Sequence, residues 1–539
     1  MNIIITIGGT GAKAGESLVY LMAAGLIKGS YEIFMIDKDK NCKNTTDEDE
    51  AIKSYQKVHQ VCNGTDGASP SLAEATLAYE TLNFDDLLTD LLKVLGINST
   101  EDERRRLDSL RGITKPRGTK NQSNEEALNL VYPKKWQEEN LGNGFQGRPF
   151  LGTAVFRAIE NTTSYKNNTL YTKIRNVLAG GETVKIFLIA SIFGGTGATF
   201  FPNIAKSIRK EFSDKQDKIQ ISGALMLPYF SLPDPGNEQD RIIKEEDFHK
   251  QAKLAVEQYL TANNLLKQSS DDKNYIFNSL YFMGLSHGKT SATYSLGGET
   301  QKHKLYIMDL YASLAVCDFF NHFDPNVNEK QIIVPVFPNQ NTQSIDWTQL
   351  PNAYETKKKM LTLTRFSTFI LTYLTPLIYQ TPDKIRSNEL IGHLYGKEGL
   401  LFNLINAKAV ISDKQIEDLR KQINVVKGFC EKYLNKYAKE IQSSQTNDGC
   451  ICNLFDVGGI ATIERKSKEG FERSQTCGLN DAIPTGVITN KKCPSSGDGI
   501  VEILMDEIPK EKGKNTENKT DMFVRQLLQQ IYEICGREI

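Results

Sequence analysis

Two nearly identical glycine-rich turns constrain this chain more than any other feature. Residues 8–13 read GGTGAK and residues 194–199 read GGTGAT. Each turn follows an apolar run, NIIITI before the first and VKIFLIASIF before the second, and each precedes a segment with apolar residues at helical spacing. Strand, tight turn and helix therefore occur twice, and this alternation predicts an α/β fold of βαβ units on a parallel sheet.

The overall charge balance argues against some classes of partner. The 65 Lys and Arg residues nearly balance the 66 Asp and Glu residues of the 539-residue chain. Since no net field draws such a chain toward nucleic acid or an anionic membrane, we expect neither as a partner. The run NIIITI is too short to span a membrane and no signal-peptide pattern precedes it, so we expect a cytoplasmic protein.

Changes of texture along the chain predict its organisation. Residues 38–140 are polar and charged, which predicts an insertion with surface helices rather than sheet core. The α/β pattern then resumes and ends in a largely apolar core helix near residues 304–322. We expect one α/β domain over residues 1–322 and a helix-rich C-terminal domain over residues 323–539, with a long amphipathic helix at residues 414–442.

Cysteine usage gives weaker information. Nine cysteines, an odd number spread over a long chain, fit reduced thiols better than a disulfide framework. Cys450, Cys452, Cys477 and Cys493 could together ligate zinc, but their spacing is not the usual paired C-x-x-C. Buried thiols are the favoured interpretation, and we predict no metal-ligating residue.

Each glycine turn is able to hold a phosphate. Glycine permits positive φ and lets a phosphate approach main-chain N–H groups without a Cβ in the way. The N-terminus of the helix that follows adds unsatisfied donors and a favourable dipole. The simpler alternative is that both turns only allow close packing of strand and helix.

Taken alone, the first turn also fits a dinucleotide-binding fingerprint. GTGAKA, residues 9–14, matches G-x-G-x-x-G/A, and Asp37 closes the next strand where a ribose-binding acid belongs. An NAD-dependent enzyme would leave the second turn unexplained, because one pyrophosphate needs one such turn. GLSHGKT, residues 284–290, is not a phosphate loop, because three residues separate its glycines where that motif requires four.

Two glycine turns in one α/β domain resemble the tubulin and FtsZ superfamily. In that family the first turn holds the nucleotide phosphates from one side, and a GGGTGSG signature holds them from the other. Here the signature stands as FGGTGAT, residues 193–199. The resemblance implies a tubulin-like Rossmann-type domain in which both turns form one cradle for GTP and Mg²⁺. The nucleotide-binding residues that it implies in the turns are Gly8, Gly9, Thr10, Gly11, Ala12, Lys13, Gly194, Gly195, Thr196, Gly197, Ala198 and Thr199.

Further segments resemble the family in their order along the chain. Asp37 falls where the family reaches toward a phosphate or its magnesium. GNGFQGRPFLG, which contains Gly147 and Arg148, lies where the γ-phosphate is sensed, and LMLPYFSLPDP resembles the segment near the ribose. LYIMDLYASL resembles the start of the core helix, with Tyr311 at the position of the asparagine that reads guanine. Tyr311 lacks that donor and acceptor pair, so it stacks on a base or belongs to the core, and the choice between GTP and ATP stays open.

The stretch SIDWTQLPN resembles the family loop whose acids complete the active site of the neighbouring subunit. Asp346 matches the first acid, and Gln349 replaces the second. An amide can orient an attacking water but cannot accept its proton, which implies slow or absent hydrolysis. A helix N-cap is the alternative role of Asp346.

The resemblance predicts a bacterial tubulin-like protein that binds GTP and assembles head to tail into filaments, with slow hydrolysis completed between subunits. A non-hydrolysing, nucleotide-dependent scaffold that engages an unidentified protein partner is the second hypothesis. An NAD-dependent enzyme is the third.

Overall fold

The computed structural model confirms an α/β fold around one parallel sheet. It describes residues 1–39, 42–63, 72–82, 109–114, 122–142, 144–145, 147–160, 162–231, 245–261, 275–286, 288–291, 303–322, 330–336, 343–388, 391, 411–455, 463–467, 470–473 and 520–536. Seven strands lie in the order β3-β2-β1-β4-β5-β7-β9, and each neighbouring pair is parallel. They are β1 (Asn2–Ile7), β2 (Ser30–Ile36), β3 (Thr76–Thr81), β4 (Val184–Ser191), β5 (Ile219–Met226), β7 (Ser279–Leu285) and β9 (Lys330–Val336).

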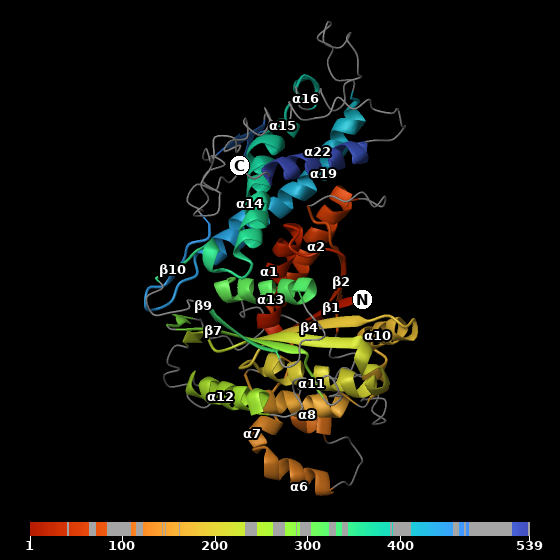
Figure 1. The fold of residues 1–539 in the computed structure, drawn as a ribbon, viewed down its shortest axis with the longest axis vertical. Coiled ribbons are helices and arrows are strands. Elements are labelled where there is room, and N and C mark those ends of the chain that lie inside the picture. The colour runs from red at the N-terminus through yellow and green to blue at the C-terminus, as the bar shows by residue number, and fades with distance from the viewer. Residues whose placement is uncertain are drawn as a thin grey trace.

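Helices cover both faces of this sheet. Figure 1 shows α1 (Gly8–Ala23) and α13 (Ile307–His322) on one face, with α11 (Gly195–Glu211) and α12 (Glu245–Thr261) on the other. Two more helices complete the second layer, α8 (Pro149–Ile159) against α11 and α10 (Thr169–Ala179) against β4. Because the sheet is covered twice, its central strands are apolar along most of their length, as in the runs NIIITI and VKIFLIAS.

The predicted core helix is α13. It contacts β4, β5, β7 and β9 on one side and α1 and α20 (Lys439–Gln442) on others, so nearly all of its residues from Ile307 to Phe319 are buried. A helix that is apolar on most sides is expected in such a place between two layers.

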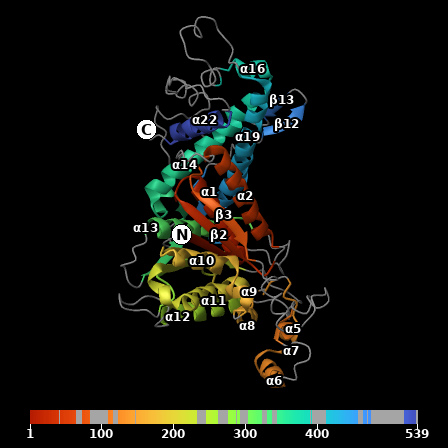
Figure 2. The same cartoon turned by 90° about the vertical axis from the view of Figure 1, so that its right-hand side faces the viewer.

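The prediction for the polar segment 38–140 was partly wrong. We expected surface helices and no sheet core, but β3 extends the sheet beside β2, and α2 (Lys43–Asn63) packs against α1. Ala51, Ile52, Tyr55, Val58 and Cys62 form the buried apolar stripe of α2. The charged residues between them lower the mean hydropathy of this stretch and hide its amphipathic pattern. The helices α5 (Leu110–Thr114), α6 (Gln122–Val131) and α7 (Lys134–Gln137) do lie away from the sheet (Figure 2).

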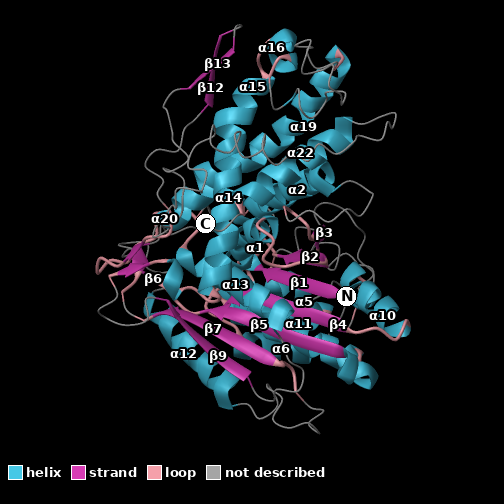
Figure 3. Cartoon of the chain, turned by 45° about the horizontal axis from the view of Figure 1, so that its top comes forward, coloured by secondary structure: helices cyan, strands magenta, loops and turns pink. Residues whose placement is uncertain are grey.

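A layer of helices from the C-terminal part of the chain covers α1 and α2 (Figure 3). It contains α14 (Ala353–Phe369), a π-helical turn (Ile370–Leu374), α15 (Thr375–Ile378), α16 (Pro382–Arg386), α19 (Asp413–Lys432), a second π-helical turn (Tyr433–Ala438), α20 (Lys439–Gln442) and α22 (Thr520–Cys535). The predicted amphipathic helix at residues 414–442 is thus confirmed. Among the described helices, none combines the length and apolar character needed to cross a bilayer.

Short elements complete the described chain. They are α9 (Thr163–Lys166), 3-10 turns at Ser213–Lys218 and Trp347–Gln349, and the strand pairs β6 (Phe230–Ser231) with β8 (Thr290–Ser291), β10 (Ser344–Ile345) with β11 (Ile451–Cys452), and β12 (Ile463–Ser467) with β13 (Gly470–Arg473).

Candidate functional site

The first glycine turn forms the N-terminus of α1. The helix begins at Gly8, directly after β1, and Gly8 itself has φ of +70°. An L-residue with a side chain rarely adopts that conformation, so glycine is required here. Ile7 precedes the helix without a side-chain cap, and no acidic residue lies in the first turn of α1.

The second glycine turn repeats this arrangement at α11. Gly194 precedes the helix without a side-chain cap, and the first turn of α11 also lacks an acidic residue. A Cβ on Gly8 would lie 3.4 Å from Cβ of Thr196 and 3.5 Å from the main-chain N of Gly197. The two turns are therefore in contact, although far apart in the sequence, because β1 and β4 are neighbours in the sheet.

Two uncapped helix N-termini that meet at one place form a favourable anion site. The first N–H groups of each helix have no intrahelical acceptor, and both helix dipoles place partial positive charge there. The remaining residues expected at the nucleotide in these turns lie in the first two turns of the same helices. They are Gly9, Thr10 and Ala12 in α1 and Ala198 in α11.

Some of the glycines also serve packing. A Cβ on Gly11 would lie 2.7 Å from the carbonyl oxygen of Ile189, and one on Gly197 would lie 2.9 Å from that of Ser191. Both glycines therefore let their helices approach the backbone of β4. The packing role that we considered as an alternative is real for Gly11 and Gly197, and it coexists with the convergence of the two N-termini.

Asp37 connects β2 to the second turn. Its Oδ1 accepts a hydrogen bond from Oγ1 of Thr196 at 3.0 Å and another from the main-chain N of Asp39 at 3.2 Å. Burial is the main reason that the pKa of Asp37 is raised to about 7, and the charge of Asp39 adds to the rise. A nearby cation would favour the ionised form of this buried carboxyl group, so Asp37 is suited to bind one.

The segment around Gly147 closes the site from a third side. A Cβ on Gly195 would lie 2.7 Å from Cβ of Phe145 and 3.0 Å from the main-chain N of Gly147. Similarly, a Cβ on Gly144 would lie 3.4 Å from Cβ of Asp39. The sequence indicated this segment through its glycines, but nothing in it singled out Phe145 or Asp39.

Two other expected residues point into internal contacts. Thr199 donates from Oγ1 to the carbonyl oxygens of Pro149 and Gly195, both at 2.8 Å, and so ties α11 to α8. Arg148 is buried, and its guanidinium lies 3.7 Å from Oε1 of Glu139.

The carboxylates around the cradle could coordinate Mg²⁺ only together with oxygen atoms from a bound phosphate. The described residues contain no group of three or more His, Cys, Asp or Glu side chains that could hold a metal. Mg²⁺ commonly takes one or two carboxylates and fills its other positions with phosphate oxygens and water. Asp37 and Asp39, beside the two helix N-termini, suit that role.

Lys13 forms a buried ion pair with the core helix. Its Nζ lies 3.1 Å from Oδ2 of Asp309, and the two side chains are 5% and 0% exposed. Burial by itself would lower the pKa of Lys13, but the charge of Asp309 and the Tyr229 hydroxyl raise it above its ordinary value. Tyr229 in turn stacks on Tyr306, with ring centroids 5.5 Å apart. Lys13 therefore joins the first glycine helix to the start of α13.

Tyr311 lies in the core. It is 3% exposed, and its hydroxyl donates to the main-chain oxygen of Gln349 at 3.4 Å. Of the two roles considered for it, the structure favours the packing role, because its ring offers little surface to a base.

Asp346 and Gln349 form a capping box. Oδ1 of Asp346 accepts from the main-chain N of Thr348 at 2.7 Å, and Oε1 of Gln349 accepts from the main-chain N of Asp346 at 2.9 Å. The N-cap role that was the alternative for Asp346 is thus present.

The position of Asp346 bears on the expectation of a site shared between subunits, which stays a prediction. A group that completes the neighbour's site must lie at the opposite end of the subunit from its own cradle. Strand β9 follows α13 and runs parallel to β7. Its carboxyl end therefore lies at the same edge of the sheet as the carboxyl ends of the other strands. Gln349 then contacts Tyr311 in the second turn of α13, and Figure 1 shows β10 on the side opposite the N-terminus. Asp346 therefore lies at the same edge as its own glycine turns.

Only half of the cysteine cluster can be placed. Cys450 and Cys452 are buried, and burial raises the pKa of Cys452 to about 12. Cys477 and Cys493 lie outside the described residues.

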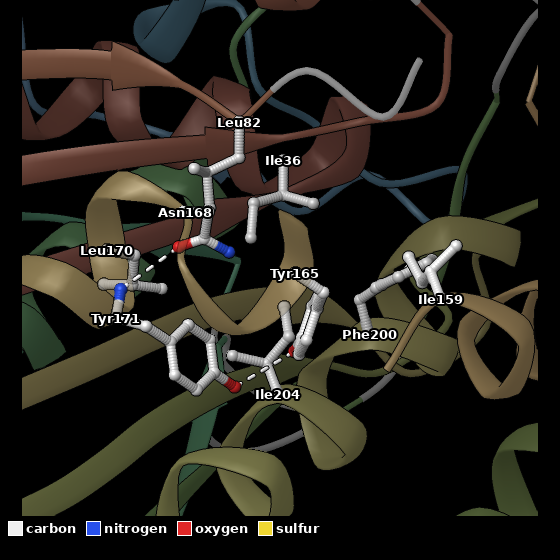
Figure 4. A pocket seen from close by; sticks show the side chains of 9 residues that line it. All are labelled: Ile36, Leu82, Ile159, Tyr165, Asn168, Leu170, Tyr171, Phe200 and Ile204. Atoms are coloured by element: carbon white, nitrogen blue, oxygen red, sulfur yellow. Dashed lines mark hydrogen bonds between the residues drawn. The ribbon is translucent and has the colours of Figure 1, made fainter. Parts of the chain in front are cut away.

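A small pocket lies between β2, α8, α9, α10 and α11 (Figure 4). Ile36, Phe200 and Ile204 are among its apolar lining residues, and no charged side chain lines it. The hydroxyls of Tyr165 and Tyr171 bond to each other at 3.1 Å. The pocket thus offers no positively charged side chain to a phosphate.

Comparison with known families adds one finding. Residues 152–245 match the model of the tubulin-like family. This stretch of the chain is similar to the tubulin-like family. The matched tubulin-like segment runs from α8 through β4, the second glycine turn, α11 and β5, so it contains one of the two turns of the cradle. No curated protein and no solved structure was found to match the chain.

Proposed function

We propose that the chain binds one nucleoside triphosphate between its two glycine turns. The contact between Gly8 and the Thr196–Gly197 turn carries this proposal, since two uncapped helix N-termini meet there. The tubulin-like match over the second turn supports GTP as the nucleotide. Asp37 and Asp39 would hold its Mg²⁺, and the metal would neutralise phosphate charge when bound.

Head-to-tail assembly into filaments belongs to the same proposal and is supported by the tubulin-like match alone. The position of Asp346 at the carboxyl edge argues against its acting on a neighbour's nucleotide. This observation favours the second candidate, a nucleotide-dependent scaffold with slow or no hydrolysis. An NAD-dependent enzyme is less well supported, because it would use the first turn and leave the contact of the second turn with Gly8 unexplained.

A binding titration with a fluorescent GTP analogue and Mg²⁺ tests this function. The variants are Gly8→Ala, whose Cβ is directed at the second turn, and Gly195→Ala, whose Cβ would displace Phe145. We expect each to weaken binding by at least about tenfold, which is 1.4 kcal/mol. Gly428→Ala is the matched control, because a Cβ at that helical position meets nothing within 4 Å.

The two turns make separable predictions. Loss of binding in Gly8→Ala with unchanged binding in Gly195→Ala would favour a site built on the first turn alone, as in the dinucleotide hypothesis. Competition with ATP and with the diphosphates measures the preference for the base. A preference for GTP of about a thousandfold or more would require hydrogen bonds to the base edge.

A further inference from the structure

The long C-terminal helix changes its winding where it meets α1. Residues 413–442 form one continuous run of α19, the π-helical turn Tyr433–Ala438 and α20. A π-helical turn is rare and inserts an extra residue into the helix, and it is frequent at functional positions. Here it coincides with the contact to the helix that starts at the first glycine turn.

Side chains of the π-helical turn pack along one face of α1. The rings of Tyr433 and Tyr437 lie 5.6 and 4.6 Å from the ring of Tyr20. The hydroxyl of Tyr437 lies 3.4 Å from Oγ of Ser17. All four residues are buried, so a shift of α1 along its axis must disturb them.

Lys436 is the charged member of this contact. Its Nζ lies 2.6 Å from Oε1 of Glu16 on α1 and 3.0 Å from Oδ2 of Asp47 on α2. The Glu16 side chain is only 4% exposed, so a negative charge on it needs a nearby cation. Burial raises the pKa of Glu16 to about 7, and Lys436 opposes that rise. The charge of Glu16 therefore depends on Lys436.

The same helix also contacts the start of the core helix. Oε2 of Glu440 accepts from the main-chain N of Leu305 at 2.8 Å, and Oγ of Ser444 accepts from the main-chain N of Ile307 at 3.0 Å. The core helix carries Asp309, the partner of Lys13 on α1. Residues 433–444 thus contact α1 and α13, the two helices that meet at the Lys13–Asp309 pair.

We propose that Lys436 couples the cradle to the C-terminal helix. A ligand at the N-terminus of α1 fixes that helix, and Glu16 transmits the change through Lys436 to residues 433–442. In this proposal the π-helical turn Tyr433–Ala438 changes between two packing arrangements that differ by one residue of register, as a coupling element requires. This inference rests on the proposed nucleotide site, because it needs a ligand that binds there.

Hydrogen exchange of the full chain, with and without GTP and Mg²⁺, tests the coupling. In the wild type, the nucleotide should slow exchange in residues 433–442 by roughly fivefold or more. In Lys436→Met this response should disappear while the nucleotide still binds. Lys432→Met is the matched control: it lies one turn earlier on the same helix and removes an exposed ion pair with Glu50, 3.4 Å away. It should keep the wild-type response.

The outcomes separate the two proposals. Wild type that fails to bind GTP overturns the nucleotide site and the coupling with it. Wild type that binds GTP without slower exchange at residues 433–442 overturns the coupling alone, as does a full response in Lys436→Met. If Lys436→Met does not fold, Glu16→Gln replaces it, because the amide keeps an oxygen for Lys436 while losing the charge. Its response should be reduced, and an unchanged response would count against the coupling.

Discussion

Thr196 in the second glycine turn donates a hydrogen bond to Asp37 at the end of β2, with 3.0 Å between Oγ1 and Oδ1. This bond links a buried carboxyl group directly to the second glycine turn. Thr196→Val keeps the shape of the side chain and removes the donor. At about pH 8, where Asp37 is mostly ionised, we expect it to cost about 1.5–3 kcal/mol in the free energy of unfolding, as for a hydrogen bond to a charged group, and to weaken Mg²⁺–GTP binding. Thr196→Ser keeps the hydroxyl and should lose much less in both measurements.

The raised pKa of Asp37 predicts how stability depends on pH. Its pKa is about 7 in the folded chain, chiefly because of burial, against an ordinary value of 3.8. The folded state therefore keeps this proton to higher pH than the unfolded state, so the contribution of Asp37 to stability falls as pH rises from about 4 to about 7. Denaturant unfolding between about pH 5 and pH 8 should show a shallower decline in Asp37→Asn than in wild type. Glu16, whose pKa is also about 7, contributes separately and is removed by Glu16→Gln. Equal slopes in wild type and Asp37→Asn would contradict the assignment.

Binding of Mg²⁺ and nucleotide should release protons. Near pH 7 Asp37 is roughly half protonated, and a cation beside it favours the ionised form, so up to about half a proton is released per site. Calorimetric titrations in two buffers with different ionisation enthalpies measure this number. Asp37→Asn should lower the release, and an identical release in that variant would place the titrating group elsewhere.

Substitutions of Asp346 distinguish a role as a helix cap from a role in GTP hydrolysis. Since its side chain caps the turn Trp347–Gln349, Asp346→Ala should cost about 1 kcal/mol in the free energy of unfolding, whereas Asp346→Asn keeps the cap and should cost little. If the residue serves only as a cap, any hydrolysis of GTP in the wild type survives in Asp346→Asn. Loss of hydrolysis in that variant, with unchanged stability and GTP binding, would restore a catalytic role. Activity per subunit should also be measured against protein concentration, because a site shared between subunits becomes more active as assembly proceeds.

The Lys13–Asp309 pair should respond as a buried ion pair. Lys13→Met leaves the Asp309 carboxylate without its counter-charge, and we expect a loss of about 3–5 kcal/mol in the free energy of unfolding. The double change Lys13→Met with Asp309→Leu removes both charges and should recover most of that loss. A single-variant cost below about 1 kcal/mol, as for a surface pair, would show that water reaches the contact.

The sequence by itself determined the local parts of this protein. Strand, glycine turn and helix follow from backbone preference and hydrophobic period, which act over a few residues, so both turns, the apolar core helix and the amphipathic helix at residues 414–442 could be predicted. The prediction of a surface insertion after β2 was partly wrong for the same reason. Charged residues alternate with the buried apolar residues of α2 around Tyr55, so the local pattern did not indicate a buried helix.

The tertiary structure decided which of these parts meet. Lys13 forms an ion pair with Asp309, and Glu16 forms one with Lys436, although hundreds of residues separate the partners in the sequence. No local sequence pattern encodes such a pairing. The position of Asp346 shows the physical reason most clearly. The sequence around Asp346 resembles a loop that directly follows a core helix. In this structure the parallel strand β9 lies between the core helix and Asp346, and it runs back across the sheet. Which edge a residue occupies depends on the path of every strand before it, and only the folded sheet fixes that path.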